Sequence, residues 1–249
     1  MRPDGVDLDL LERSLRRARP LLVHTIPNFH NPTGITTGQA HRERLLTICE
    51  ARRVPIVEDG FDEEMKYFGT AVLPIKSMDA RGIVLYLGTF SKVVFPGLRI
   101  GWVVAPAEAI ERLAAIQRLS SLSGNTLAQA AAARFCAAGL YEAHLRRVHR
   151  VYRGRMQAAL RGLREQMPEG VEWTEPSGGY TLWLRVSGRR GEEAALAERF
   201  AREGVRVAPG SLFYLRPPAD PHFRLSIACA GEEEILEGCR RLGRALRAS

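Results

Sequence analysis

Long hydrophobic runs are absent from this chain of 249 residues. No stretch approaches the roughly 20 consecutive apolar residues that cross a bilayer. The first five residues contain no apolar segment of the kind that a secretion signal needs. These absences predict a protein with no transmembrane helix and no membrane partner, located in the cytoplasm.

Cysteine is scarce, with four residues in the chain. The cysteines are not spaced in the pairs of a zinc site, and they are too few to cross-link a chain of this length, so we expect them to be reduced. The six histidines form no ligand-like cluster along the sequence, and we interpret them as structural. We therefore predict no metal site.

Lysine is the scarcest cation: of 36 lysines and arginines, only Lys66, Lys76 and Lys92 are lysines. The net charge of +8 raises the question of nucleic-acid binding. The arginines, however, are spread over most of the chain and share helical stretches with glutamates, which is typical of solvated helix faces. We do not expect nucleic-acid binding from this chain.

The apolar pattern predicts helices separated by short strands, which is typical of a mostly parallel α/β sheet. The first part gives strands at 21–26, 54–58, 83–89 and 100–105 and helices at 8–17, 36–53, 107–120 and 126–167. Thr36 and Gln39 resemble a capping box, and Gly139 is expected to interrupt the last helix. Later strands at 171–174, 180–186, 205–208 and 223–228, with helices at 192–203 and 231–246, indicate a small α+β domain. We predict two domains, 1–123 and 124–249, the second beginning with a long connecting helix.

The stretch from Thr89 to Trp102 carries the most specific chemistry. It places Lys92 just after an apolar strand, with Thr89 and Ser91 beside it, and a Pro-Gly turn leads to Arg99. A lysine amine forms an imine with an aldehyde, while hydroxyls and a guanidinium bind a phosphate. The pattern indicates a site for an aldehyde cofactor with a phosphate arm. A surface lysine and an ordinary strand-end serine are the simpler alternatives.

Three other polar residues stand at turns or strand ends. Asp59 ends an apolar strand, where ligands bind in α/β sheets, and a carboxylate there can pair with a protonated ring nitrogen; a turn or capping aspartate is the alternative. Asn31 stands in an Asn-Pro turn, which is common for local reasons alone. Arg224 opens an apolar strand, where it can bind a carboxylate or form a surface salt bridge.

Four segments, in this order, resemble the signatures of the class I/II aminotransferases, fold-type-I enzymes that use pyridoxal 5′-phosphate (PLP). They are 27–34 (PNFHNPTG), 57–61 (VEDGF), 89–99 (TFSKVVFPGLR) and 223–226 (FRLS). Segments 62–67 and 88–92 are similar to the branch that contains 2-aminoadipate-type aminotransferases and the aminotransferase-like domains of MocR regulators. The resemblance extends from about residue 5 to the C-terminus.

The resemblance implies a role for each matching residue. Lys92 would bind PLP as a Schiff base and shuttle the substrate proton, and Asp59 would pair with the pyridine nitrogen. Asn31 would bind the phenolic oxygen of PLP, and Arg224 the substrate α-carboxylate. The phosphate would be held by Thr89, Ser91 and Arg99. Phe61 occupies the cofactor-facing position where this branch has a tyrosine, so it lacks that hydroxyl.

The implied function is amino transfer between an α-amino acid and a 2-oxo acid, by a homodimer with its sites at the subunit interface. Two alternatives stay open: the PLP-sensing domain of a MocR/GntR-type transcriptional regulator, and an inactive remnant. The chain begins where the family is already well inside its large domain, without the Gly-rich phosphate loop and the stacking aromatic. We therefore expect the later part of a fold-type-I large domain plus a small α+β domain.

Overall fold

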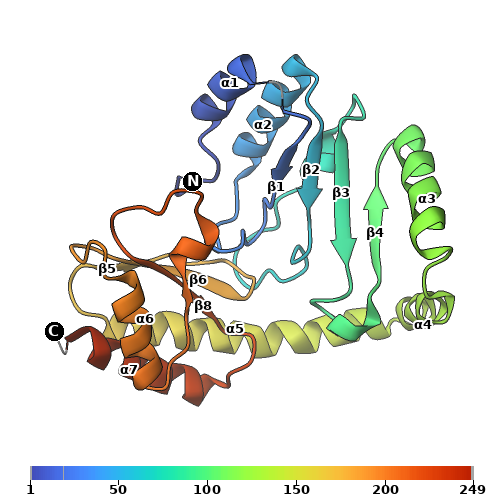
Figure 1. Ribbon diagram of the computed structural model, residues 1–249. Helices are drawn as coiled ribbons and strands as arrows, with labels where there is room; N and C mark the ends of the chain where they lie inside the picture. Colours follow the sequence, from blue (N-terminus) through green and yellow to red (C-terminus); the bar gives the residue numbers. More distant parts are fainter. Residues whose placement is uncertain (1, 19, 248–249) are drawn as a thin grey trace. The chain divides into compact units, whose positions relative to one another are not determined.

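The computed structural model describes residues 2–18 and 20–247 (Figure 1). Contacts between residues group the chain into two compact units. The first unit comprises Met1–Asn28, Thr36–Met65 and Thr70–Val148, and the second comprises Phe29–Ile35, Lys66–Gly69 and His149–Ser249. The division into domains 1–123 and 124–249 places the boundary elsewhere and stays a prediction.

The first unit contains a four-stranded sheet in the order β1-β2-β3-β4 (Figure 1). The strands are β1 (Val23–Thr25), β2 (Ile56–Asp59), β3 (Val84–Thr89) and β4 (Gly101–Val104). The pairs β1–β2 and β2–β3 are parallel, which confirms the predicted parallel α/β arrangement. Strand β4 is antiparallel to β3, because the connection between them is a short loop without a crossover helix.

Helices of the first unit follow the predicted pattern with one correction. They are α1 (Leu8–Arg17), α2 (Gln39–Arg52), α3 (Ala107–Ser121), α4 (Thr126–Ala137) and the start of α5 (Leu140–Gln166). Gly139, with φ of 69°, separates α4 from α5 as predicted. The prediction that Thr36 and Gln39 form a capping box is wrong, because Gly38 is the N-cap of α2 and makes no side-chain cap bond. None of the described helices is long and apolar enough to span a membrane.

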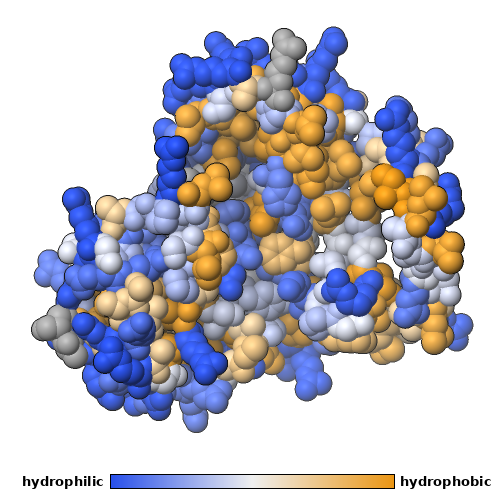
Figure 2. All heavy atoms as spheres, viewed as in Figure 1, coloured by the Kyte–Doolittle hydropathy of each residue, from blue (hydrophilic) through white to orange (hydrophobic). Residues whose placement is uncertain are grey.

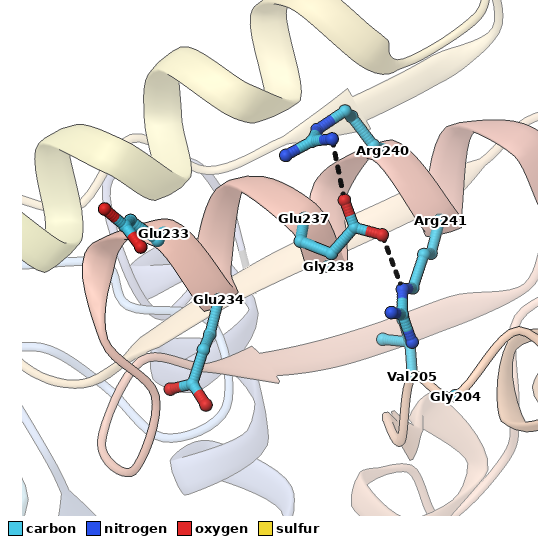
Figure 3. Close-up of a pocket in the computed structure, with 8 residues that line it drawn as sticks. All are labelled: Gly204, Val205, Glu233, Glu234, Glu237, Gly238, Arg240 and Arg241. Carbon is cyan, nitrogen blue, oxygen red and sulfur yellow. Dashed lines mark hydrogen bonds and ion pairs between the residues drawn. The ribbon is translucent and has the colours of Figure 1, made fainter.

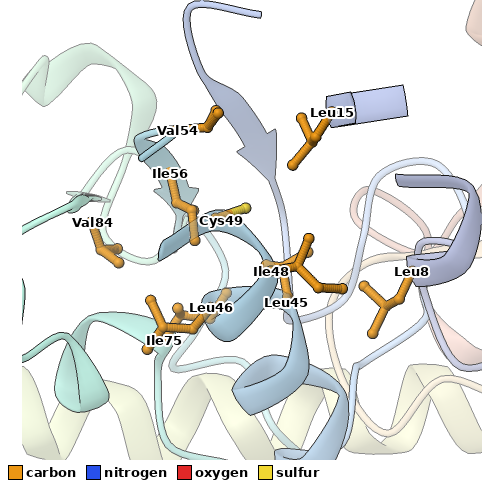
Figure 4. Packing of buried hydrophobic residues seen from close by; sticks show 10 residues of the cluster. All are labelled: Leu8, Leu15, Leu45, Leu46, Ile48, Cys49, Val54, Ile56, Ile75 and Val84. Atoms are coloured by element: carbon orange, nitrogen blue, oxygen red, sulfur yellow. The ribbon is translucent and has the colours of Figure 1, made fainter. Parts of the chain in front are cut away.

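The core of the first unit lies between helices α1 and α2 and the parallel strands (Figure 4). Figure 4 shows side chains from these elements meeting around Cys49, which is fully buried. Burial raises the pKa of the Cys49 thiol to about 11. A thiol in this environment stays protonated, so Cys49 serves packing rather than catalysis.

The second unit contains an antiparallel sheet in the order β5-β6-β8-β7, as expected for a small α+β domain. Its elements are β5 (Val171–Trp173), β6 (Thr181–Val186), α6 (Glu193–Arg202), β7 (Ala208–Pro209), β8 (His222–Ser226), α7 (Glu232–Arg247) and the end of α5. The strand predicted at 205–208 is reduced to β7. The reason is that the Val205 amide donates to the Phe200 carbonyl and closes α6 instead of pairing in the sheet.

Candidate functional site

The carboxyl ends of two parallel strands bring four predicted site residues to one edge of the first sheet. In the register of β2 and β3, Asp59 lies opposite Leu87, and Thr89 ends β3 two residues later. Ser91 and Lys92 follow at once in a turn. Ligands of α/β proteins bind at such an edge, because loops there diverge and leave polar groups exposed.

Asp59 is held from two sides. Its Oδ1 accepts a hydrogen bond of 3.2 Å from the Phe61 amide, and its Oδ2 lies 3.6 Å from Nε2 of His24 on β1. The His24 ring is thus a neighbour of the predicted cofactor-binding carboxylate, which the sequence interpretation of this histidine as merely structural did not anticipate. The available signal was a polar ring inside an otherwise apolar strand. Phe61 is half-buried beside this turn.

Thr89 organises the turn that carries Lys92. Its hydroxyl donates to the Ile100 carbonyl at 3.1 Å and accepts from the Ser91 amide at 3.1 Å. Ser91 is buried, whereas Lys92 is exposed. Arg99 is exposed, with φ of 52° and Nη1 3.5 Å from the Pro96 carbonyl oxygen. Its guanidinium can therefore turn toward an anion.

Asp62 is a buried acid that sequence reasoning missed. The residue is 4% exposed, and its Oδ1 has no hydrogen-bond partner. Burial raises the pKa of this carboxyl to about 8, although the positive charge of Lys92 acts in the opposite direction. The carboxyl of Asp62 is therefore largely protonated near neutral pH. The signal in the sequence was its position three residues after Asp59.

Arg42 on α2 is a second residue that the sequence analysis did not identify. Its side chain is fully buried. Its guanidinium donates to Asn28 Oδ1 at 2.7 Å, to the Leu73 carbonyl at 2.9 Å, and to the Thr37 hydroxyl at 3.1 Å. Further bonds reach the carbonyls of Pro27 and Thr37. Desolvation lowers the pKa of Arg42. The side chain thus joins the residues before and after segment 29–35, which carries Asn31.

In the second unit, Asn31 and Arg224 are brought together from positions far apart in the sequence. Arg224 Nη1 on β8 donates to Asn31 Oδ1 at 2.8 Å. The guanidinium lies over the ring of Phe213, 5.0 Å from its centroid, and its Nε is buried without a hydrogen-bond partner. Such a group is a donor suited to an anionic ligand.

A surface cavity in the second unit contains none of the predicted site residues (Figure 3). It lies between the loop at Gly204 and Val205 and helix α7. Glu237 bridges two arginines there, accepting from Arg240 Nη1 and Arg241 Nε at 2.8 Å each. These bonds lie within one helix and are typical of a solvated face, so the cavity is not part of the candidate site.

The sequence model described as Aminotransferase class I and II matches residues 3–242. This chain belongs to the class I and II aminotransferase family. The chain is 40% identical over 248 residues to the 2-aminoadipate transaminase of Thermus thermophilus, covering 98% of this chain and 62% of that protein. It is 36% identical over 250 residues to aromatic-amino-acid aminotransferase 1 of Thermococcus litoralis, covering 98% and 60%.

Solved structures of aminotransferases agree with this family membership. The multiple substrate aminotransferase of Thermococcus profundus superposes with a TM-score of 0.94 at 35% identity, covering 99% of this chain and 62% of that one. LysN, the α-aminoadipate aminotransferase of Thermus thermophilus, gives a TM-score of 0.90 at 36% identity, covering 99% and 64%, and was solved with N-(5′-phosphopyridoxyl)-L-leucine. The fold-type-I prediction is confirmed. The chain spans about three fifths of the length of the curated aminotransferases it matches.

Proposed function

We propose that this chain carries the lysine-bearing part of a PLP-dependent aminotransferase, which moves an amino group between an α-amino acid and a 2-oxo acid. The observation that carries the proposal is the placement of Asp59 at the end of β2 and of Lys92 three residues after β3, the parallel neighbour of β2, in a member of this family. An amine and a carboxylate at one sheet edge suit the aldehyde and the ring nitrogen of PLP.

The residues of the first unit fit the cofactor by chemical type. Lys92 would bind the aldehyde carbon, and Asp59 would keep the ring nitrogen protonated. Ser91 and Arg99 would hold the phosphate, while Thr89 fixes the turn between them. When bound, PLP supplies a ring that accepts electron density from the substrate Cα. The Lys92 amine, once released, would take the Cα proton and return it to the product.

The buried neighbour of Lys92 supports this use of the amine. Asp62 is the buried carboxyl on whose pKa the positive charge of Lys92 acts. Because burial raises the pKa of Asp62 to about 8, that carboxyl is largely neutral at pH 7. Asp62 therefore places less negative charge beside Lys92 than an ionised carboxylate would.

Substrate recognition is proposed for the Asn31–Arg224 pair of the second unit. A guanidinium binds a carboxylate through two parallel hydrogen bonds, and the partnerless Nε of Arg224 is a donor for one of them. Asn31 holds the other side of the guanidinium through its Oδ1. Asn31 can in addition donate from its amide nitrogen to the phenolic oxygen of the cofactor, the role that the family resemblance implies.

We further propose that the working protein is a cytoplasmic homodimer. The homodimer rests on the family resemblance. Reduced cysteines support the location, because Cys49, Cys136, Cys229 and Cys239 are all free thiols in the structure.

A regulatory domain is the second candidate, because HTH-type transcriptional regulators are among the relatives of this chain. The chain is 33% identical over 241 residues to the HTH-type transcriptional regulator YdfD of Bacillus subtilis, covering 97% of this chain and 48% of that protein. A sensor domain would bind PLP through Lys92 without sustained turnover. Sustained transamination over many cycles would favour the enzyme, whereas slow turnover by the chain alone is expected under both functions.

The test of the proposed function uses the attachment of PLP. Borohydride reduction of the PLP-treated protein is expected to leave a covalent label on the peptide that contains Lys92, with little on Lys66 or Lys76. Lys92→Arg should abolish the label, while Lys66→Arg should retain it. Label on Lys66 or Lys76, or none on Lys92 while PLP is bound, contradicts the assignment.

A further inference from the structure

A histidine of helix α5 is hydrogen-bonded to the turn that carries Lys92. His144 Nε2 lies 2.8 Å from the Val93 carbonyl oxygen. A carbonyl oxygen can only accept, so Nε2 carries the hydrogen and donates it. Both residues belong to the first unit, and Val93 directly follows Lys92 in the chain. The bond therefore acts on the backbone next to the candidate lysine from an element 51 residues later in the sequence.

The peptide group between Val93 and Val94 is held at both ends. Its N–H, which belongs to Val94, donates to the Phe90 carbonyl at 2.9 Å and closes the turn. Its C=O, which belongs to Val93, accepts from His144. Because a peptide group is planar and stiff, holding both ends fixes the orientation of the backbone that follows Lys92.

The bond from His144 also satisfies a buried acceptor. Val93 is 4% exposed, and no backbone amide among the residues that the structure describes donates to its carbonyl. A buried carbonyl without a donor is unfavourable. If His144 lost its N–H donor, this peptide group would have to rotate toward water, and the backbone of Lys92 would move with it.

Aromatic rings support the same contact between α5 and the turn. Tyr141, three residues before His144, lies on the same face of α5 and meets the Phe90 ring edge-on, with centroids 5.5 Å apart and planes at 88°. Phe135 of α4 contacts both α5 rings, with its centroid 6.5 Å from Tyr141 and 6.3 Å from His144. Phe90 stands two residues before Lys92, so α5 contacts the turn on both sides of the lysine.

We propose that His144 is a positioning residue for Lys92, which holds the lysine turn so that the amine meets the cofactor aldehyde in one fixed geometry. The proposal rests on the proposed attachment of PLP to Lys92. A misplacement of about 1 Å can slow such a reaction strongly, so the reacting group needs a rigid support. His144 acts through the Val93 backbone and exchanges no proton with the reactants.

Another histidine of the first unit provides a matched control. His41 Nε2 on α2 lies 2.9 Å from the Val6 carbonyl oxygen, and His41 is half-buried, as His144 is. Asparagine is too short to place a donor where Nε2 stands, whereas glutamine can reach that position. His144→Asn and His41→Asn therefore remove the same kind of bond at two places, and His144→Gln restores the first.

The first measurement is amide hydrogen exchange of residues 1–249 without PLP. In His144→Asn the Ser91 and Val94 amides should exchange about tenfold faster than in the parent protein, because the turn opens more often. His144→Gln should restore the parent rates, and His41→Asn should leave them unchanged.

A milder variant keeps this measurement decisive if His144→Asn does not fold. Phe135→Leu retains the bond to Val93 but removes the ring behind His144, and it should accelerate exchange of the same two amides about threefold. Parent-like exchange in the folded variant, or equal acceleration by His41→Asn, would overturn the proposal.

The second measurement is the distribution of PLP label among the lysines after borohydride reduction. The ratio of label on Lys92 to label on Lys76 should fall about tenfold in His144→Asn, recover in His144→Gln, and stay at the parent value in His41→Asn. Selective labelling of Lys92 in the parent, with the same selectivity in His144→Asn, would overturn the role of His144 and leave the proposed function intact. Label on another lysine in the parent would contradict the proposed function itself, and with it the role of His144.

Discussion

Arg42 shows how one side chain can fix a loop that carries a candidate site residue. Its buried guanidinium donates to groups on both flanks of segment 29–35, including Asn28 Oδ1 and the Thr37 hydroxyl. A guanidinium suits this task because its five donors form a rigid fork. The Pro27 carbonyl also accepts from the Thr37 amide and hydroxyl, so Arg42 matters most to Asn28 Oδ1 and the Leu73 carbonyl.

Replacing Arg42 is therefore expected to be costly. Arg42→Met should lower the free energy of unfolding by about 3 kcal/mol or more, because several buried acceptors lose their donor. Arg44→Met, at an exposed arginine of the same helix, should change it by less than about 1 kcal/mol. Urea denaturation of both variants makes the comparison. Equal effects of the two substitutions would contradict the role given to Arg42.

The raised pKa of the buried Asp62 carboxyl predicts that the stability of the protein depends on pH. Its folded-state pKa of about 8 lies above its ordinary value of 3.8, so the folded state binds the proton more tightly than the unfolded state. The contribution of Asp62 to stability is complete below about pH 4 and is lost as pH rises toward 8. The charges that act on this group are those of Lys92, which favours ionisation, and of Asp59 and Glu64, which oppose it.

Asp62→Asn keeps the shape of the side chain and removes its titration. The free energy of unfolding of the parent protein should fall between pH 5 and pH 8 because Asp62 ionises. In Asp62→Asn this fall should be smaller. Asp4→Asn, at an exposed carboxylate, should leave that difference unchanged. An identical pH profile for Asp62→Asn and the parent would show that the buried carboxyl does not titrate in this range.

Sequence reasoning predicted some of these residues and missed others for a physical reason. Lys92 and Asp59 stand directly after apolar strands, so their positions at a sheet edge follow from local patterns. The importance of Arg42 and Asp62 comes from burial, which depends on segments distant in sequence. The hydrogen bond between Asn31 and Arg224 could not be predicted from local patterns either, because the two residues lie 193 positions apart in the sequence.

Helices α5 and α7 approach each other closely in the second unit, and glycine makes this possible. A Cβ on Gly162 of α5 would lie 2.9 Å from Cys239 Sγ on α7. A Cβ on Gly243 of α7 would collide with the Gln166 carbonyl oxygen at the end of α5. Gly238, also on α7, has nothing within 4 Å of its Cβ position.

These two glycines of α7 should respond oppositely to alanine. Gly243→Ala is expected to destabilise the protein by about 1–3 kcal/mol, because backbone must move to admit the methyl group. Gly238→Ala should stabilise it by about 0.5–1 kcal/mol, because alanine favours the helix and meets no neighbour. Thermal unfolding measures both. Stabilisation by both substitutions would contradict the close approach of α5 and α7.

Secondary structure was predictable where a local pattern decided it, and not where tertiary contacts did. The helix break at Gly139 could be predicted because glycine readily adopts positive φ. The antiparallel direction of β4 could not be predicted, because the apolar pattern of a strand is the same in either direction. The start of α2 was missed because the Thr37 hydroxyl bonds to the Pro27 carbonyl, a contact ten residues away.

At the scale of the whole molecule, the candidate site belongs to a chain in which many large apolar side chains are exposed (Figure 2). Asp59 ends β2 and Lys92 follows β3, whereas β4, on the other side of β3, is an edge strand of the sheet that the described residues form. The turn that holds Ser91 and Lys92 is tied to Ile100 just before β4 through the Thr89 hydroxyl. The lysine turn and the start of β4 are therefore linked through this hydrogen bond.

The share of its relatives that this chain leaves unmatched predicts its cofactor behaviour. Residues 1–249 alone should bind PLP weakly and transaminate slowly or not at all, and a fusion with the part of the Thermus thermophilus 2-aminoadipate transaminase that lies outside the match should improve both. Titration with PLP and the amino-acid half-reaction, followed by absorbance, give the comparison. Lys92→Arg in the fusion is the control for binding that does not use the lysine. Tight PLP binding with ordinary turnover by the short chain would mean that its own residues already complete the site.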